Sequence, residues 1–372
     1  MAIAKVPLNN FYKNLATGLF ILIATGYLAI LLKEILSPLL FAFLFAVLLL
    51  PIAGFLERRL LLPRSAASGL SVMILIIFMG LILYLVGSQL SNLSNDWPLF
   101  KEHLHLSLTN LQKWVSNRLG INSAKQLDLA SEATSKVLSS TTFVLGATVL
   151  SVSSILLFLV FTLINTFLLL FYRRLMVKFL IQLFKEQNNV IIYEIITEVQ
   201  YIIRRFITGL LLEMAIVSGI CFGALSMLGV KYAILLGLLT GLLNVIPYIG
   251  IFTAIILSAL ITFATGAAGG KIFAVIITLV LIHLTDSNIL FPWIVGSKVR
   301  INAFITLLGV IIGQILWGIT GMFLAIPIIA TAKIVFDRIE MLQPWGLLFG
   351  DEKDENQPGK RWLQRKKMKK SI

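Results

Sequence analysis

Long apolar runs alternate with short charged segments along most of the chain. Several runs reach about 18 residues or more, the length at which a helix can cross the hydrocarbon core of a bilayer. Most of them are closed by charged or strongly polar residues, as expected of membrane helices joined by hydrophilic turns. The pattern predicts six full spans, at residues 15–32, 39–56, 70–90, 143–172, 208–228 and 272–284.

A further apolar run, Tyr232–Thr265, is interrupted by the stretch Asn244-Val-Ile-Pro-Tyr-Ile-Gly250. Each half has about 15 residues, or roughly 22 Å of helix, which is short for a bilayer core of ~30 Å. Pro247 has no N–H and disfavours a continuous helix, and Gly250 allows another backbone to come close. This run therefore forms either a re-entrant hairpin or two short tilted spans joined by a turn.

A second interrupted run, Phe304–Phe336, is broken at Gly318-Ile-Thr-Gly321. Irregular backbone at membrane depth is tolerated only where protein or a water-filled cavity covers it. If both runs are hairpins, their tips lie beside a substrate path.

The resulting fold class is an all-α polytopic membrane protein with about six full spans plus two broken or re-entrant helical hairpins. Lys and Arg concentrate on the cytoplasmic side of membrane proteins, which places both termini in the cytoplasm. The predicted organisation is N-terminal spans at 1–91, an extracytoplasmic polar helical insert at 92–142, a span at 143–172, a cytoplasmic amphipathic arm at 173–205, a transport core at 206–337 with hairpins at 231–266 and 302–337, and a basic cytoplasmic tail at 338–372.

Composition agrees with a membrane protein, because only 13% of residues are charged and the mean hydropathy is +0.96. A soluble chain has about 25% charged residues. The net charge of +14 fits a cytoplasmic Lys/Arg bias and a tail that contacts anionic lipid headgroups, and no motif suggests a nucleic-acid partner. With one cysteine, three histidines and no zinc-helix, nucleophile-elbow or phosphate-loop motif, we expect no enzyme, no metal site and no cofactor.

Polar residues within the apolar runs are the candidate site. A charge at mid-bilayer costs roughly 2.5–3.5 kcal/mol, so such residues need a partner or a function. Asp286 and Glu213 are candidate cation or proton sites; alternatively, each carboxylate pairs with a basic residue or lies at the water interface. The candidates for substrate or ion binding are Glu213, Asn244, Pro247, Tyr248, Gly250, Asp286, Asn288, Pro292, Gly296 and Gln314.

Four segments form a combination of motifs: Gly229-Val-Lys-Tyr-Ala-Ile-Leu-Leu-Gly237, Leu242-Leu-Asn-Val-Ile-Pro-Tyr-Ile-Gly250, Asn288-x3-Pro292-x3-Gly296, and Gly318-x2-Gly321 with Leu324-Ala-Ile-Pro327. Together these segments resemble the autoinducer-2 exporter family. The likeness covers most of the chain and is strongest between residues 204 and 337. It implies a homo-oligomeric transporter of the bacterial inner membrane with elevator-like hairpins.

The resemblance leaves the substrate and the coupling ion open. Some relatives are associated with export of autoinducer-2 and others with sodium–proton antiport. Where the family usually has Gln in the fifth span, this chain has Leu210 after Gly209, and Ile251 stands where Pro often follows Tyr-Ile-Gly.

The functional prediction is a secondary transporter, an exporter of a small polar solute such as autoinducer-2-like signal molecules. The solute would bind between residues 244–250 and 286–296, and a proton or sodium gradient would drive its movement. Two alternatives remain: a monovalent cation–proton antiporter that uses Asp286 and Glu213, and a non-transporting membrane scaffold that docks partners through the insert and the arm.

Overall fold

The computed structural model describes residues 8–96, 98, 102, 106, 109, 123–184, 189–246, 249–267, 269–294 and 301–350. Within these ranges all regular structure is helical, apart from an isolated bridge between Ile301 and Gly350. The elements are α1 (Leu8–Leu31), α2 (Lys33–Arg59), α3 (Arg64–Asn95), α5 (Ser123–Leu183), α6 (Asn189–Met227), α7 (Ala233–Leu243), α8 (Ile249–Ala264), α9 (Gly269–Thr285), the π-helical turn η2 (Asp286–Leu290), α10 (Phe291–Ile294), α11 (Ala303–Trp317), α12 (Ile319–Arg338), the 3-10 turn η3 (Glu340–Leu342) and α13 (Gln343–Phe349).

Six helical segments of the described chain are long and apolar enough to cross a membrane, which confirms the prediction of an all-α polytopic membrane protein. The set differs from the predicted one at two places. The apolar part of α1, Ala16–Leu31, is among the shorter helices, whereas α12 is long enough to span although it is half of a broken run. The six are Lys33–Arg59, Arg64–Leu93, Ser153–Leu183, Asn189–Met227, Gly269–Ile294 and Ile319–Arg338.

Large apolar side chains cover the outside of the long helices. Examples are Phe20 on α1, Ile77 and Tyr84 on α3, and Phe161 on α5, all of them exposed. A water-soluble monomer rarely exposes contiguous apolar surface of this extent, whereas a bilayer favours it. The apolar exterior and the predicted membrane location therefore agree.

Helix α6 is the element to which both broken runs attach. Its 39 residues correspond to roughly 58 Å, so it extends well beyond a bilayer core of ~30 Å. One stripe of the helix is buried, and it packs on α2 and α12 in its first half and on α7 and α9 in its second. The segment 173–205, which the sequence presented as an arm, is divided between the end of α5 and the first half of α6.

Two glycines allow α7 to lie directly against α6. A Cβ atom at Gly237 would come within 2.8 Å of the backbone nitrogen of Phe222, and one at Gly241 would come within 2.6 Å of the carbonyl oxygen of Met214. Small residues four positions apart are a common means of bringing membrane helices into close contact. The contact fixes where α7 ends, at Asn244.

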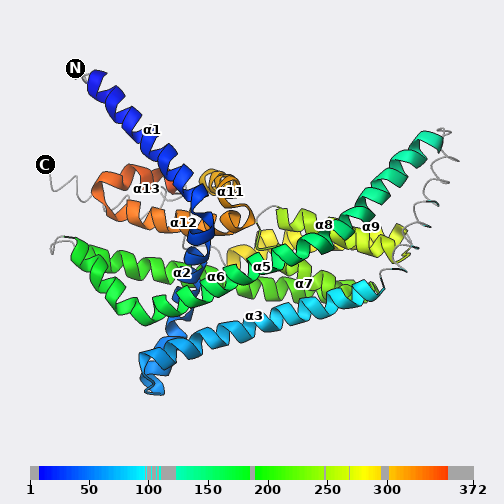
Figure 1. Ribbon diagram of the computed structural model, residues 1–372, viewed down its shortest axis with the longest axis horizontal. Coiled ribbons are helices and arrows are strands. Elements are labelled where there is room, and N and C mark those ends of the chain that lie inside the picture. The colour runs from blue at the N-terminus through cyan, green and yellow to red at the C-terminus, as the bar shows by residue number, and fades with distance from the viewer. Residues whose placement is uncertain are drawn as a thin grey trace.

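Both broken runs fold back as pairs of helices (Figure 1), α7 with α8 and α11 with α12. In the first pair Gly250 packs on the backbone of Leu243, so closely that no side chain would fit. In the second, the chain turns at Gly318 with a φ of 64°, and Gly313 and Gly321 pack backbone against backbone. The two pairs meet where Ile246 packs against Val310, Met322 and Ala325.

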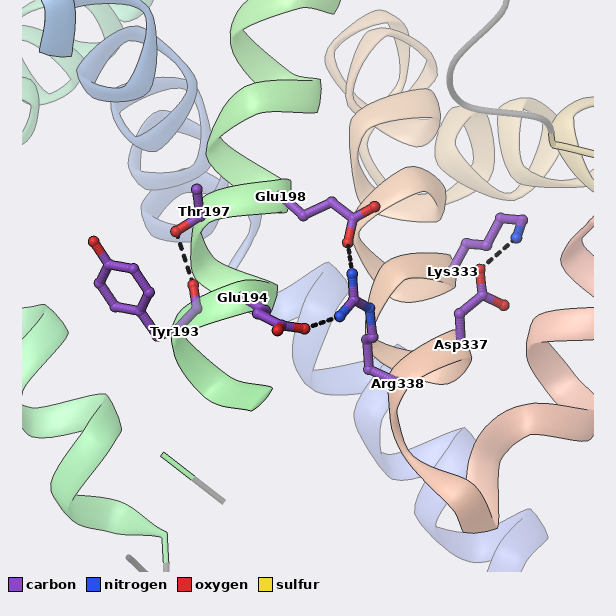
Figure 2. A network of polar contacts seen from close by, with 7 residues as sticks. All are labelled: Tyr193, Glu194, Thr197, Glu198, Lys333, Asp337 and Arg338. Carbon is purple, nitrogen blue, oxygen red and sulfur yellow. Dashed lines mark hydrogen bonds and ion pairs between the residues drawn. The ribbon is translucent and has the colours of Figure 1, made fainter. Parts of the chain in front are cut away.

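Ion pairs join the end of α12 to the start of α6 (Figure 2). Arg338 donates to Glu194 and, at 2.7 Å, to Glu198, while Lys333 pairs with Asp337 one turn earlier. Exposed pairs of this kind contribute about 0–1 kcal/mol each, so they orient the helix end more than they stabilise it. Beyond Arg338 the chain forms η3 and α13, which pack back on α12, so the first residues assigned to the tail are folded.

A second polar cluster joins the end of α3 to the start of α7. Asp96 accepts a hydrogen bond from the Tyr232 hydroxyl at 2.6 Å and pairs with the Lys231 ammonium at 2.7 Å. The hydrogen bond from Lys231, followed by that from Tyr232, lowers the pKa of Asp96. A carboxyl whose pKa is lowered on folding stabilises the folded state above its unfolded pKa of about 3.9 and loses that effect as the pH falls.

We predict that replacing Gly241 by Ala destabilises the protein by about 1–3 kcal/mol, because overpacking forces α7 away from α6. The measurement is thermal unfolding of the purified protein in detergent. Gly223→Ala is the matched control, since a Cβ there meets no atom within 4 Å. Equal melting temperatures for the two variants would contradict the proposed helix contact.

We also predict that Asp96→Asn lowers the melting temperature at neutral pH, and that the difference from wild type shrinks as the pH falls below about 4. The stabilisation depends on the ionised form of the Asp96 carboxylate. At low pH this carboxylate is protonated in both the folded and the unfolded state, so the stabilisation is lost. The control is Glu340→Gln, an exposed carboxylate on η3 with no ion pair among the described residues. A pH-independent difference for Asp96→Asn would show that the ion pair contributes nothing.

Candidate functional site

Three polar side chains from different elements meet inside the protein: Glu213 of α6, Asn244 at the end of α7 and Asp286 at the start of η2. The amide nitrogen of Asn244 donates to Glu213 Oε1 at 2.9 Å and to Asp286 Oδ2 at 2.9 Å. Ionised carboxylates only accept hydrogen bonds, so the two protons of one amide are shared between two acids. Residues separated by 31 and 42 positions are thereby joined in one cluster.

Both carboxyl groups are buried, with 3% of Glu213 and 4% of Asp286 exposed. Each keeps one oxygen, Glu213 Oε2 and Asp286 Oδ1, with no hydrogen-bond partner. Among the described residues no Lys or Arg lies within ion-pair distance of either group. Two anions in a medium of low dielectric are costly without a compensating positive charge. The cluster is therefore suited to hold a cation or a proton.

The sequence of α6 explains the place of Glu213. Phe206, Leu210, Glu213 and Val217 follow at intervals of three and four, and all are buried. Residues at this spacing share one face of a helix. Glu213 is thus the one acid within the described apolar stripe, at the point where the packing of α6 passes from α12 to α7.

Asp286 is the first residue of a π-helical turn. The turn η2 follows α9 directly, and its Asp286 carbonyl accepts from the backbone of Phe291. Insertion of a π turn rotates the following residues relative to an α-helix, and such turns occur often at functional sites. Asp286 is the buried residue of the turn, whereas Asn288 is exposed.

The cluster lines a cavity of about 310 Å³. This volume lies at the lower end of the range for small-molecule sites. Its lining combines the two carboxylates and the amide with apolar residues of several elements, among them α6 and α12. The lining residues are Phe206, Leu210, Glu213, Asn244, Val245, Ile246, Ile251, His283, Asp286, Ser287, Phe291, Thr306, Met322, Phe323 and Ile326.

Some sequence candidates lie away from the cavity. Asn288 donates to the Leu284 carbonyl of its own helix, and Pro292 and Gln314 are exposed. Gly250 is buried, where it supports the turn after Asn244 and does not line the cavity. Pro247, Tyr248 and Gly296 lie outside the described residues.

The apolar walls were missed as site residues. Phe206 and Leu210 could have been found, because they precede Glu213 on the same helical face. Met322, Phe323 and Ile326 carry no such signal, since they belong to an apolar helix that is distant in sequence. Ser287 lies 3.3 Å from His283 Nε2, and His283 Nδ1 has no partner, so this pair adds a polar edge.

The described part of the chain holds no group of three or more His, Cys, Asp or Glu residues placed to bind a metal. The two carboxylates offer hard oxygen ligands, which prefer alkali or alkaline-earth cations to transition metals, whereas the Asn244 amide turns its N–H groups toward them. Hydroxyl groups of a solute would also find acceptors in the two oxygens that lack partners.

Comparison with known proteins identifies relatives along the chain. A model of the AI-2E family of transporters matches residues 19–341. The chain is 28% identical to the AI-2 transport protein TqsA of Escherichia coli over 347 residues, which cover 90% of this chain and 96% of the relative. It is 33% identical to YrrI and 31% identical to YueF of Bacillus subtilis over 124 and 137 residues, about a third of the length of each.

We predict that Asn244→Leu lowers the free energy of unfolding by about 2–4 kcal/mol, because it removes two hydrogen bonds to buried carboxylates and leaves both acids without a donor. Chemical denaturation in detergent measures the change. Asn288→Leu is the matched control, since Asn288 is exposed and bonds only within its own helix. A cost no larger than that of the control would contradict the bridging role of Asn244.

Proposed function

Because the chain belongs to the AI-2E family of transporters, we propose that it is a secondary transporter that binds a small polar solute in the cavity around Glu213, Asn244 and Asp286. The family and the long apolar helices make it a multi-pass protein of the bacterial inner membrane. Solutes such as autoinducer-2-like signal molecules, moved outward, are the substrates we propose. TqsA, to which the chain is similar, is named as an AI-2 transport protein.

The observation that carries the proposal is the pair of buried carboxyl groups held by one amide. Both acids line a cavity of about 310 Å³ and each has one oxygen without a partner, to which a hydroxyl-bearing solute would donate. Apolar residues of α12 would cover the carbon skeleton of that solute. A site composed mainly of apolar walls with a few convergent polar groups is typical of small-molecule binding.

We propose that a proton or a sodium ion accompanies the solute, bound between Glu213 and Asp286. A cation at this point would compensate the buried negative charge. Asn244 cannot do so, since its amide is neutral and both of its protons are already donated. The free energy of the ion gradient would then act on the same cluster that contacts the solute.

In this proposal the parts that move during transport are the two helix pairs, α7 with α8 and α11 with α12. The Asn244 cluster and the contact between Ile246 and Met322 lie where the pairs meet, so displacing one pair would open the cavity to one side. This is the elevator-like arrangement implied by the resemblance, with both termini cytoplasmic, the basic tail on anionic headgroups and the chain a homo-oligomer.

A cation–proton antiporter is the second candidate, and the same acid pair favours it. Two carboxylates that share one site can exchange one cation for a proton without any organic solute. A non-transporting scaffold, the third candidate, would need neither buried acid, so its function would be unchanged by Glu213→Gln and Asp286→Asn.

We predict that proteoliposomes containing the purified protein move labelled autoinducer-2 in response to a pH or sodium gradient, and that Asp286→Asn and Glu213→Gln each reduce the rate at least tenfold. Both variants remove a charge from the ion site but keep the shape of the side chain. An internal pH-sensitive dye, with pulses of sodium, lithium or potassium, measures cation-linked proton movement in the same vesicles.

Asp337→Asn is the matched control, because this acid pairs with Lys333 on the outer part of α12 and lies away from the cavity. Cation-dependent proton flux without solute, lost in Asp286→Asn, would replace the exporter proposal by the antiporter. A transport role for the cluster would be contradicted if the folded wild-type protein moved neither solute nor protons. It would also be contradicted if all three variants moved them at the wild-type rate.

A further inference from the structure

A second cavity, separate from the acid cluster, lies where α2 ends and α3 begins, against α5 and α6. Its volume is about 1020 Å³. The lining residues include six arginines and one acid, namely Arg58, Arg59, Arg64, Arg173, Arg174, Arg204 and Glu57. Such an excess of positive charge predicts an anionic ligand.

Within the described part of the chain, two of these arginines are compensated by a carboxylate. Arg173 pairs with Glu57 at 2.6 Å and Arg174 approaches the same oxygen at 3.8 Å. Arg58, Arg59, Arg64 and Arg204 make no ion pair with any described residue. Four guanidinium groups therefore remain to bind a ligand, and guanidinium matches the geometry of phosphate oxygens.

The inner wall of the cavity has one unsatisfied donor and one unsatisfied acceptor. Arg173 Nη1 and Glu57 Oε1 are both buried without a hydrogen-bond partner. A phosphate oxygen would accept from Arg173, and a hydroxyl group would donate to Glu57. These two atoms without hydrogen-bond partners fit a ligand that carries a phosphate and a hydroxyl close to each other.

The other part of the lining is apolar and extends along α2. Val47, Leu50, Pro51, Gly54 and Phe55 line the cavity on the way from Arg58 into the apolar span. Eleven positions separate Val47 from Arg58, or roughly 16 Å of helix. A free phosphate would not use this wall, whereas an acyl chain would.

We propose that this cavity binds an anionic glycerophospholipid of the membrane, with the phosphodiester on the arginines, a glycerol hydroxyl on Glu57 and an acyl chain along α2. Basic pockets between membrane helices are known to hold lipid headgroups of this kind. The bound lipid would join α2, α3, α5 and α6 at one membrane surface. The proposal is independent of the transported solute, since the cavity shares no lining residue with the acid cluster.

The test is native mass spectrometry of the full chain released from detergent that contains equal amounts of phosphatidylglycerol and phosphatidylcholine. We expect the wild type to retain phosphatidylglycerol preferentially. The double variant Arg64→Gln/Arg204→Gln should lower that retention at least tenfold, because each basic group at a lipid surface contributes about fivefold to binding. Arg205→Gln is the control of equal chemistry on α6, since Arg205 does not line the cavity.

A second variant separates lipid from free phosphate. Gly54 lines the cavity and a Cβ there meets no atom within 4 Å, so Gly54→Leu adds volume to the apolar part and keeps every arginine. It should reduce phosphatidylglycerol retention, and excess inorganic phosphate should not displace the lipid from wild type. Displacement by inorganic phosphate, full retention in Gly54→Leu, or equal retention in the double variant and Arg205→Gln would each overturn the proposal.

Discussion

The interior of this protein depends on one neutral amide that holds two acids together. Asn244 donates to Glu213 and Asp286 at 2.9 Å each, in surroundings where a charge without a partner would cost several kcal/mol. To place Asn244 there, α7 must lie against α6 without side chains between them, and Gly237 and Gly241 allow this. The helix packing and the candidate chemistry are therefore consequences of the same contact.

In this arrangement no positive group among the described residues balances the charges of the two carboxyl groups. The Asn244 amide satisfies one oxygen of each carboxyl group and leaves the other buried without a hydrogen-bond partner. A structural acid would be expected to have its ion pair inside the protein, as Glu57 does with Arg173. No such pair is present among the described residues around Glu213 and Asp286, and this difference from Glu57 supports our proposal that the cluster binds a ligand.

The sequence was sufficient to identify the three central residues, because each is polar within an apolar run. It could not show that they meet, since the separations of 31 and 42 residues are closed by tertiary packing. Asn288 and Gln314 met the same criterion yet lie away from the cavity, because a polar residue near a helix end can bond its own backbone or reach the surface. The apolar walls on α12 were missed because apolar residues in an apolar helix carry no local signal.

The fold class followed from hydropathy alone, because a bilayer admits only segments whose backbone is fully hydrogen-bonded. Element lengths did not follow as directly: α12 has 20 residues after the turn at Gly318, long enough to span a membrane, although the run to which it belongs was predicted as a hairpin.

The central claim, that Glu213 and Asp286 form one site able to hold a proton or a cation, is tested most directly by labelling with dicyclohexylcarbodiimide, an apolar reagent that modifies protonated carboxyl groups. Peptide mass spectrometry would locate the modified residues in the folded protein with and without sodium or solute. We predict that the reagent modifies Glu213 or Asp286, and that sodium or solute slows the rate of this modification. Absence of modification at both acids, or rates that no ion or solute changes, would contradict it.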